Sequence, residues 1–240
     1  MRRLAAGAAA LLDLQLTPAQ LDAFQVYADE LADWNARFNL TAITDPEAVQ
    51  LKLFLDSLTC LLALRAWPLP AGTALIDVGA GAGFPGLPLK IVCPDLRLTL
   101  LEATGKKVKF LEHLVAKLSL SGVTAFQARA EEVGRDPAHR EQYDWALARA
   151  VAELPVLAEY LLPLVRVGGR CLAQKGASAA AEAQATGRAL KVLGGRLDRI
   201  LPVELPGEAE TRYLVVIEKV TPTPAKYPRR PGLPAKAPLR

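Results

Sequence analysis

From Thr73 onward, short apolar runs alternate with segments long enough to form helices. A chain with this alternation folds as a parallel sheet, because each helix can cross over the sheet and return the chain to start the next parallel strand. We therefore predict an α/β, Rossmann-like fold with helices on both faces of the sheet. The predicted strands lie near residues 74–78, 96–101, 123–128, 143–148 and 168–174, and the predicted helices near 85–92, 105–119, 153–166 and 178–193.

The end of this alternation has a different pattern. Leu197–Leu205 and Thr211–Val220 are two β-rich runs, and the short link over Pro206–Glu210 contains no helix. A link of this length joins antiparallel neighbours. We therefore expect a mostly parallel sheet with an antiparallel last strand.

Helical patterns precede the first predicted strand. Thr17 and Pro18 suit the N-cap and the first position of a helix, and apolar residues follow at helical spacing. A second helical stretch, roughly Glu47–Ala66, begins after Asp45-Pro46. The predicted organisation is a helical extension over residues 1–70, an α/β domain over 71–220 and a basic, proline-rich tail over 221–240.

The composition is typical of a water-soluble globular protein, with 51% hydrophobic and 22% charged residues. Cys60, Cys93 and Cys171 show no C-x-x-C spacing, which favours a reducing compartment and gives no sign of a zinc site. The apolar run Leu4–Leu12 is too short to span a bilayer, and Asp13 follows it directly. We expect a cytoplasmic protein that acts as a monomer, without a membrane partner or a metal.

The predicted tail is strongly basic. It contains five basic side chains and no acid, whereas the rest of the chain has a net charge of −1. Six of the 18 prolines lie in Pro222–Arg240, so we expect this segment to be extended or irregular. An unstructured basic segment on a near-neutral body is typical of contact with a polyanion, although the same charge can serve solubility alone. The basic residues are Lys226, Arg229, Arg230, Lys236 and Arg240.

A glycine-rich turn follows the first predicted strand. Residues 77–86 read Asp-Val-Gly-Ala-Gly-Ala-Gly-Phe-Pro-Gly, and their glycines satisfy both the dinucleotide fingerprint and the first motif of class I S-adenosylmethionine-dependent methyltransferases. Asp77 would repel a pyrophosphate but attract the ammonium group of a methionine moiety, and Pro85 has no amide to offer a phosphate. S-adenosylmethionine is therefore the favoured ligand. The predicted contacts in this turn are Asp77, Gly79, Gly81 and Gly83.

Side chains after the later strands complete a candidate site at one edge of the sheet. Glu102 ends the second predicted strand, where a carboxylate can accept both ribose hydroxyls of an adenosine. Ala130-Glu131 follows the third strand, near the expected adenine position, while Glu132 equally suits a cap of the next helix. Arg149 ends the fourth strand and can pair with the cofactor carboxylate or a substrate phosphate. Lys175 follows the fifth strand at the same edge.

Motifs along almost the whole chain point to one family. They are Trp34-Asn35, Asn39-Leu40-Thr41-Ala42-Ile43, Leu55-Asp56-Ser57-Leu58, residues 77–86, Arg129-Ala130-Glu131, Arg149-Ala150-Val151, Lys175-Gly176 and Tyr227-Pro228-Arg229. In this order they closely resemble the RsmG family, also called glucose-inhibited division protein B, of bacterial small-subunit ribosomal RNA guanine-N7 methyltransferases. Two positions differ, because the family commonly has aspartate at Glu102 and histidine at Leu53. Glutamate keeps both acceptor oxygens, so ribose binding is expected to survive.

The resemblance implies a class I S-adenosylmethionine-dependent methyltransferase that modifies N7 of a guanosine in 16S ribosomal RNA, namely guanosine 527 of the 530 loop. The implied partner is 16S ribosomal RNA or the 30S subunit. The implied cofactor contacts lie around Gly79 and Phe84, at Glu102-Ala103-Thr104, at Ala130-Glu131 and at Arg149. The RNA contacts that we expect are Arg149, Lys175, Lys226, Arg229 and Arg230.

The sequence shows no arrangement of His, Cys or Ser typical of nucleophilic or acid–base catalysis. The implied reaction needs none, because neutral guanine has no proton on N7 and orientation of the reactants can supply the catalysis. We therefore predict no catalytic general base. Two alternatives remain open: a small-molecule methyltransferase on the same fold, and a nicotinamide-dependent oxidoreductase that uses the overlapping glycine fingerprint.

Overall fold

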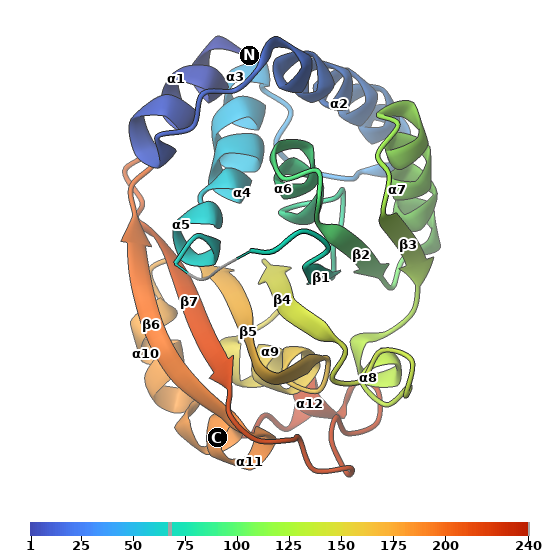
Figure 1. Ribbon diagram of the computed structural model, residues 1–240, viewed down its shortest axis with the longest axis vertical. Helices are drawn as coiled ribbons and strands as arrows, with labels where there is room; N and C mark the ends of the chain where they lie inside the picture. Colours follow the sequence, from blue (N-terminus) through green and yellow to red (C-terminus); the bar gives the residue numbers. More distant parts are fainter. Residues whose placement is uncertain (67–68, 240) are drawn as a thin grey trace.

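A seven-stranded sheet runs through the part of the chain that the computed structural model describes, residues 1–66 and 69–239 (Figure 1). In sheet order its strands are β3 (Val123–Gln127), β2 (Arg97–Glu102), β1 (Ala74–Val78), β4 (Tyr143–Arg149), β5 (Val165–Lys175), β7 (Arg212–Lys219) and β6 (Gly195–Val203). Strands β1 to β5 pair in parallel, and β7 lies antiparallel between β5 and β6. This confirms the predicted α/β fold with its antiparallel last strand.

Helices cover both faces of the sheet, as Figure 1 shows with the N-terminal helices at the top and α9 to α12 at the bottom. The first group is α1 (Arg2–Leu12), α2 (Pro18–Phe38), α3 (Pro46–Ala48), the π-helix η1 (Val49–Leu55), α4 (Asp56–Leu58), α5 (Leu61–Leu64), α6 (Gly86–Val92) and α7 (Gly105–Lys117). The second group is α8 (Ala130–Val133), α9 (Leu154–Leu161), α10 (Ala179–Ala185), α11 (Gly187–Leu193) and α12 (Leu233–Lys236).

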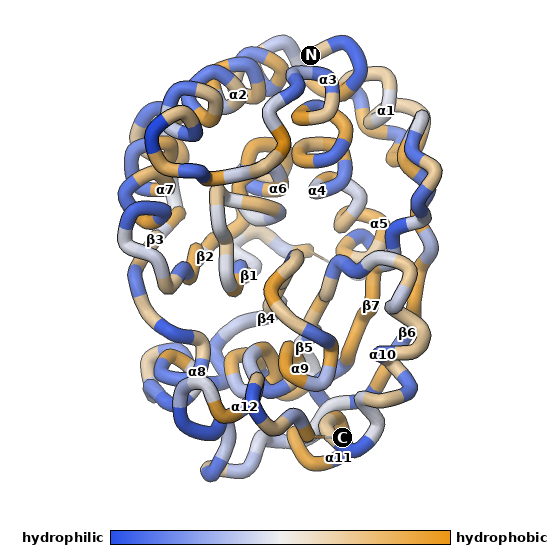
Figure 2. Tube along the Cα trace, turned by 180° about the vertical axis from the view of Figure 1, so that it is seen from behind, coloured by the Kyte–Doolittle hydropathy of each residue, from blue (hydrophilic) through white to orange (hydrophobic). Residues whose placement is uncertain are grey.

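The strands bury side chains on both faces because successive residues of a strand point to opposite sides. Leu75 of β1 packs into the core formed with the first group of helices, whereas Ile76 packs into the core formed with α8 to α11. Val216 and Val215 of β7 divide in the same way. This explains why the predicted strands are continuous apolar runs. Figure 2 shows the hydrophobic strands inside and hydrophilic residues along the outer side of α2.

Helix α2 begins where the sequence predicts. Thr17 caps α2 in a capping box, since its hydroxyl accepts the Gln20 amide at 3.2 Å and the Gln20 side chain accepts the Thr17 amide at 2.9 Å. Leu4 and Phe54, from α1 and η1, share one apolar core with Leu75 of the sheet. Residues 1–66 therefore cover one face of the sheet. The domain boundaries at residues 70 and 220 remain predictions.

Two segments differ from the predictions. The helix expected over 178–193 is two helices, because the Thr186 hydroxyl donates to the Glu182 carbonyl at 2.6 Å and Gly187 follows. The C-terminal segment, residues 221–239, was predicted to be unstructured, but it packs against the body and includes α12. Thr223, Tyr227 and Pro234 of this segment are buried, because loops and helices of the body supply donors and apolar surface to it.

Within the described ranges, none of the helices combines the length and the apolar character that a membrane span requires.

Candidate cofactor and acceptor site

The glycine turn lies at the carboxyl edge of the sheet, between β1 and α6. The Gly79 amide donates to the Leu101 carbonyl of β2 at 2.8 Å, which fixes the turn against the neighbouring strand. Gly79 and Gly83 have positive φ angles of 73° and 99°. A Cβ on Gly83 would lie 2.5 Å from the Tyr27 hydroxyl, and a Cβ on Gly79 would lie 2.7 Å from the Val151 side chain. Both the backbone conformation and the close approach therefore require glycine.

Asp77 is the buried acid of this turn. Its Oδ2 accepts the Gly86 amide at 2.8 Å, while its Oδ1 is buried without a hydrogen-bond partner among residues 1–66 and 69–239. Burial raises the pKa of the Asp77 carboxyl to about 7, against the opposing effects of the Gly86 amide and the Arg149 guanidinium. A buried acceptor oxygen without a partner costs free energy, and a cationic or hydrogen-bonding ligand group that pairs with it would remove this cost.

Aromatic side chains support the turn from α2 and η1. The Tyr27 ring stacks on Phe84 with centroids 5.3 Å apart, and its hydroxyl donates to the Ala82 carbonyl at 2.5 Å. Phe54 of η1 packs against both rings. Helical periodicity predicts that Tyr27 and Phe54 are buried but not what each buried ring contacts.

Glu102 ends β2 beside the turn. Its Oε2 accepts the Gly81 amide at 3.0 Å and its Oε1 accepts the Thr104 amide at 2.8 Å. Glu102 is buried, with 7% of the residue exposed, and both carboxylate oxygens are oriented by backbone amides. An ionised carboxylate has about four lone-pair sites, which leaves acceptor capacity for two further hydroxyl donors.

A cavity of about 250 Å³ opens between the ends of β1, β2 and β4. We call it the Glu131 cavity, and it brings together the predicted residues Gly79, Ala103, Ala130 and Glu131. Tyr160 of α9 also lines it, and burial and the Glu131 carboxylate raise the pKa of Tyr160 to about 12. Glu132 is not part of the cavity, because its side chain accepts the Arg129 amide at 3.1 Å; the capping role considered for it is confirmed.

Arg149 lies at the end of β4 and is held by the N-terminal helices. Its guanidinium forms an ion pair with Asp56 at 3.2 Å and donates to the Lys52 carbonyl at 2.5 Å. The Ser57 hydroxyl lies 3.3 Å from the same group. The guanidinium carbon also lies 5.9 Å from the Phe84 ring centroid. Arg149 thus connects the glycine turn with the helices that cover it.

A second cavity, of about 290 Å³, is lined by Arg149, and we call it the Arg149 cavity. Lys52, Lys175 and Arg212 also line it, together with Asp56, whose pKa burial raises. The Lys175 ammonium pairs with Glu182 at 2.7 Å. Sequence reasoning missed Arg212, because it begins a strand that is distant in the chain and no local pattern relates it to Arg149.

Several solved methyltransferases share this fold. A geranyl diphosphate methyltransferase in complex with geranyl diphosphate and sinefungin aligns with a TM-score of 0.56 and 13% identity, covering 85% of this chain and 100% of that one. TrmN from Thermus thermophilus aligns with a TM-score of 0.52 and 20% identity, covering 69% of this chain and 48% of that one. At these identities the likeness shows the class I methyltransferase fold alone.

The model of the GidB family, described as rRNA small subunit methyltransferase G, matches residues 20–207. The chain belongs to this family. Relatives named ribosomal RNA small subunit methyltransferase G include that of Roseiflexus sp. (strain RS-1), 54% identical over 226 residues, which are 94% of each chain. That of Pelotomaculum thermopropionicum is 51% identical over 228 residues, which are 95% of this chain and 94% of the relative. The predicted family is confirmed, and the chain is a methyltransferase by family.

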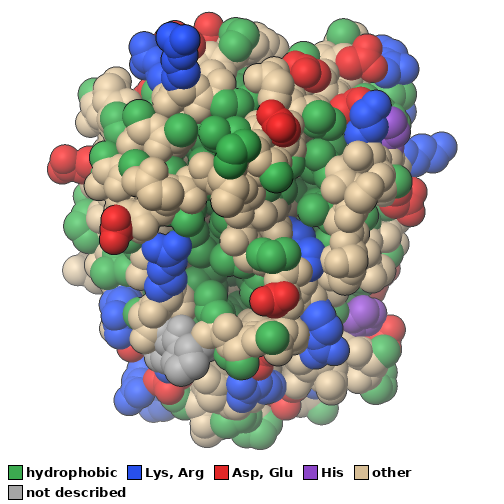
Figure 3. Space-filling model, turned by 45° about the horizontal axis from the view of Figure 1, so that its top comes forward, with side chains coloured by type: hydrophobic (Ala, Val, Ile, Leu, Met, Phe, Trp, Pro, Cys, Tyr) green, Lys and Arg blue, Asp and Glu red, His purple; other side chains and the backbone are tan. Residues whose placement is uncertain are grey.

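The family motif Tyr227-Pro228-Arg229 lies in the C-terminal segment, where the structure differs from the predicted basic tail. The Arg229 guanidinium pairs with the buried Glu159 carboxylate at 2.6 Å and is not free for a phosphate. Lys226 and Arg230 are exposed. On the face shown in Figure 3, Lys and Arg side chains lie scattered among Asp and Glu.

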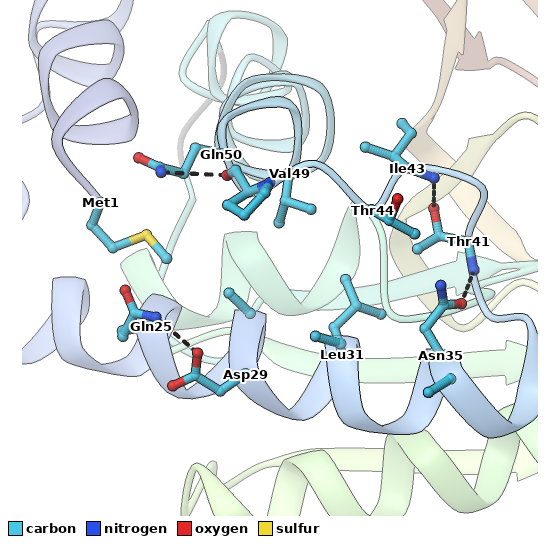
Figure 4. Close-up of a pocket in the computed structure, with 14 residues that line it drawn as sticks. Met1, Gln25, Asp29, Leu31, Asn35, Thr41, Ile43, Thr44, Val49 and Gln50 are labelled. Atoms are coloured by element: carbon cyan, nitrogen blue, oxygen red, sulfur yellow. Dashed lines mark hydrogen bonds between the residues drawn. The ribbon is translucent and has the colours of Figure 1, made fainter.

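Thr41 and Ile43 of the family motif over residues 39–43 line a cavity. A third cavity, of about 420 Å³, lies among α1, α2 and the residues around α3 (Figure 4). The Asn35 side chain accepts the Thr41 amide at 2.8 Å, and the Thr41 hydroxyl accepts the Ile43 amide at 3.1 Å (Figure 4). Ile43 lines both this cavity and the Arg149 cavity. The hydrogen bonds of Asn35 and Thr41 therefore fix the position of Ile43 beside the Arg149 cavity.

No group of three or more His, Cys, Asp or Glu side chains within residues 1–66 and 69–239 is arranged to hold a metal ion. His113 of α7 instead contacts Glu30 of α2 at 2.7 Å, and His139 stacks between Phe126 and Tyr143.

Proposed function

We propose that this chain transfers the methyl group of S-adenosylmethionine to N7 of a guanosine in 16S ribosomal RNA, guanosine 527 in the 530 loop. The observation on which the cofactor assignment rests is the Asp77 carboxylate, buried in the glycine turn with an unpartnered Oδ1. This feature suits an ammonium group and disfavours a pyrophosphate. The ribosomal RNA acceptor rests on the family, whose members are named for it.

The residues present fit S-adenosylmethionine. We assign Asp77 and Gly79 to its methionine part, the Glu102 carboxylate to its ribose and the Glu131 cavity to its adenine. The oriented oxygens of Glu102 support this assignment, as does the open space over Gly81, where a Cβ would lie 3.8 Å from the Gly79 carbonyl oxygen, its nearest atom among the described residues other than its chain neighbours. When bound, this cofactor supplies an electrophilic methyl group on a sulfonium.

We assign the acceptor base to the Arg149 cavity. Arg149 borders the glycine turn through Phe84 and lines this cavity, so it lies where cofactor and acceptor would meet. Lys52, Lys175 and Arg212 line the same cavity, where they pair with Glu208, Glu182 and Glu210, and we propose that phosphates next to the target base compete with these carboxylates for the three cations. An acceptor nucleotide in such a cavity has to be unpaired or splayed out, which a ribosomal RNA loop permits.

The chain's own residues contribute by orientation. Guanine N7 presents a lone pair without a proton, so no side chain has to act as a general base. Holding nucleophile and leaving group in line is worth up to about 7–11 kcal/mol in well-oriented systems. The buried pairing of Arg149 with Asp56 keeps that guanidinium in one place, as such orientation requires.

We further expect Lys226 and Arg230 to contact RNA, and the enzyme to act as a cytoplasmic monomer on 16S ribosomal RNA or the 30S subunit. Purified protein should transfer tritiated methyl from S-adenosylmethionine to 30S subunits isolated from cells that lack the family's enzyme. Borohydride and aniline cleavage should then map a single N7-methylguanosine to the 530 loop. Transfer to small molecules but not to ribosomal RNA would contradict this proposal, and binding of NADH without S-adenosylmethionine would contradict the cofactor assignment.

A further inference from the structure

The C-terminal segment is bound to the body by two arginines of the loop that follows α8. The Arg140 guanidinium donates to the carbonyls of Thr223 and Tyr227 at 2.6 and 2.8 Å. The Arg135 side chain donates to the Pro228 carbonyl at 2.7 Å. Backbone carbonyls of an otherwise irregular segment thus obtain charge-assisted hydrogen bonds, which are about twice as strong as neutral ones.

Arg229 fixes the same segment to α9. Its backbone amide and its Nε both donate to Glu159 Oε1, at 2.7 and 2.9 Å, and its Nη2 donates to Oε2 at 2.6 Å. The Glu159 residue has no exposed surface. A carboxylate buried to this degree requires its partner, since removing one member of a buried pair leaves an uncompensated charge.

The segment then reaches the Glu131 cavity. The Gly232 amide donates to Glu131 Oε1 at 2.8 Å, and Glu131 itself is 3% exposed. Three residues further on, Ala235 of α12 lines the cavity together with Gly79 and Tyr160. Glu131 is thus shared between the cavity and the C-terminal segment.

We propose that the C-terminal segment forms the outer wall of the adenosine end of the cofactor pocket, with Ala235 facing the cofactor and Arg229 a positioning residue that holds this wall through Glu159. The inference rests on the proposed cofactor site. It gives the basic residue Arg229 a role in cofactor affinity, in place of a contact with RNA. Lys226 and Arg230, whose side chains are exposed, keep the proposed RNA contact.

Two matched substitutions in α12 and just after it test the wall. Ala235→Phe puts a large ring into the Glu131 cavity, whereas Ala237→Phe puts the same ring at an exposed position that does not line the cavity. Both alanines are exposed, so neither substitution should prevent folding. We expect Ala235→Phe to weaken S-adenosylmethionine binding by roughly tenfold or more in Kd by calorimetry, and Ala237→Phe to leave it unchanged. Equal affinity of the two variants would overturn the proposal.

A second ligand tests whether the loss of affinity arises at the adenosine end of the pocket. 5′-Methylthioadenosine contains the adenosine part without the amino acid, so its Kd should rise by the same factor in Ala235→Phe. Arg229→Ala should weaken both ligands, and Arg229→Lys, which keeps a cation beside Glu159, should restore part of the loss. If Arg229→Ala binds the cofactor normally but binds RNA more weakly, Arg229 contacts RNA and the proposed positioning role is wrong. Failure of the unmodified protein to bind S-adenosylmethionine would instead refute the proposed function itself.

Discussion

The Asp77 Oδ2 accepts the Gly86 amide at 2.8 Å, and a Cβ on Gly86 would lie the same 2.8 Å from that oxygen. The first helix after the glycine turn can therefore approach the buried acid only because its first residue is glycine. This contact lowers the pKa of Asp77, but burial outweighs it and the pKa rises to about 7. Arg149 and Glu102 are the charged groups that act on this carboxyl, with opposite signs.

Cofactor affinity should depend on the ionisation of Asp77. The ionised carboxylate attracts the ammonium group that we assign to it, so the Kd for S-adenosylmethionine should fall between pH 6 and pH 7.5 by several-fold, at most about tenfold. 5′-Methylthioadenosine lacks the ammonium group and should show no such trend. Asp77→Asn should remove the dependence, and a pH profile unchanged in this variant would exclude Asp77 as its origin.

The same carboxyl should make folding stability depend on pH. Its folded pKa is raised above 3.8, so its contribution to the free energy of unfolding is complete below that pH and is lost as the pH rises through about 7. Denaturant titrations of the ligand-free protein should therefore give a smaller decrease in stability from pH 5 to pH 8 for Asp77→Asn than for the unmodified chain. Parallel decreases in the two proteins would assign the dependence to other groups.

Glu102 should tolerate shortening better than loss of charge. Both of its oxygens accept backbone amides, so Glu102→Gln would place an NH₂ group against one of these donors. We expect Glu102→Gln to raise the Kd for S-adenosylmethionine by about tenfold or more. Glu102→Asp, the residue that the family commonly has, should stay within a few-fold of the unmodified protein. The reverse order of affinities would contradict this account of Glu102.

Gly83→Ala should destabilise the protein. The new Cβ would lie 2.5 Å from the Tyr27 hydroxyl and 2.6 Å from a Leu87 methyl group, at a φ of 99°. We expect a loss of about 2–4 kcal/mol in the free energy of unfolding, measured by denaturant titration. Gly187→Ala is the matched control, because the residue is helical and no atom of the described residues outside its own helix backbone and chain neighbours lies within 4 Å of the new Cβ. Equal stability of the two variants would contradict the close packing of the turn.

The exposed cations of the C-terminal segment should affect RNA binding through salt. Lys226→Ala and Arg230→Ala should each weaken binding to 30S subunits and reduce the slope of log K against log salt by about 1. Lys191→Ala removes an exposed cation from α11 and serves as the control. A salt slope that stays unchanged in both variants would remove this segment from the RNA interface.

The order of elements and the core of the cofactor turn follow from the sequence. Apolar runs and helical spacing are local, and parallel strands bring their carboxyl ends to one edge, so the meeting of Gly79, Glu102 and Ala130 at that edge is a consequence of chain order. The antiparallel pairing of β6 with β7 follows in the same way from a link too short to hold a helix.

Contacts between distant segments were decided by tertiary packing. Nothing in the local pattern indicates that Tyr27 supports the glycine turn 55 residues later, or that Arg212 joins Arg149 at one cavity. The charge of the C-terminal segment is readable from the sequence, but whether a guanidinium faces solvent or a buried carboxylate is not. Arg229 pairs with Glu159, 70 residues earlier in the chain, because the fold packs α9 against the C-terminal segment. This packing places a predicted RNA contact in an internal ion pair.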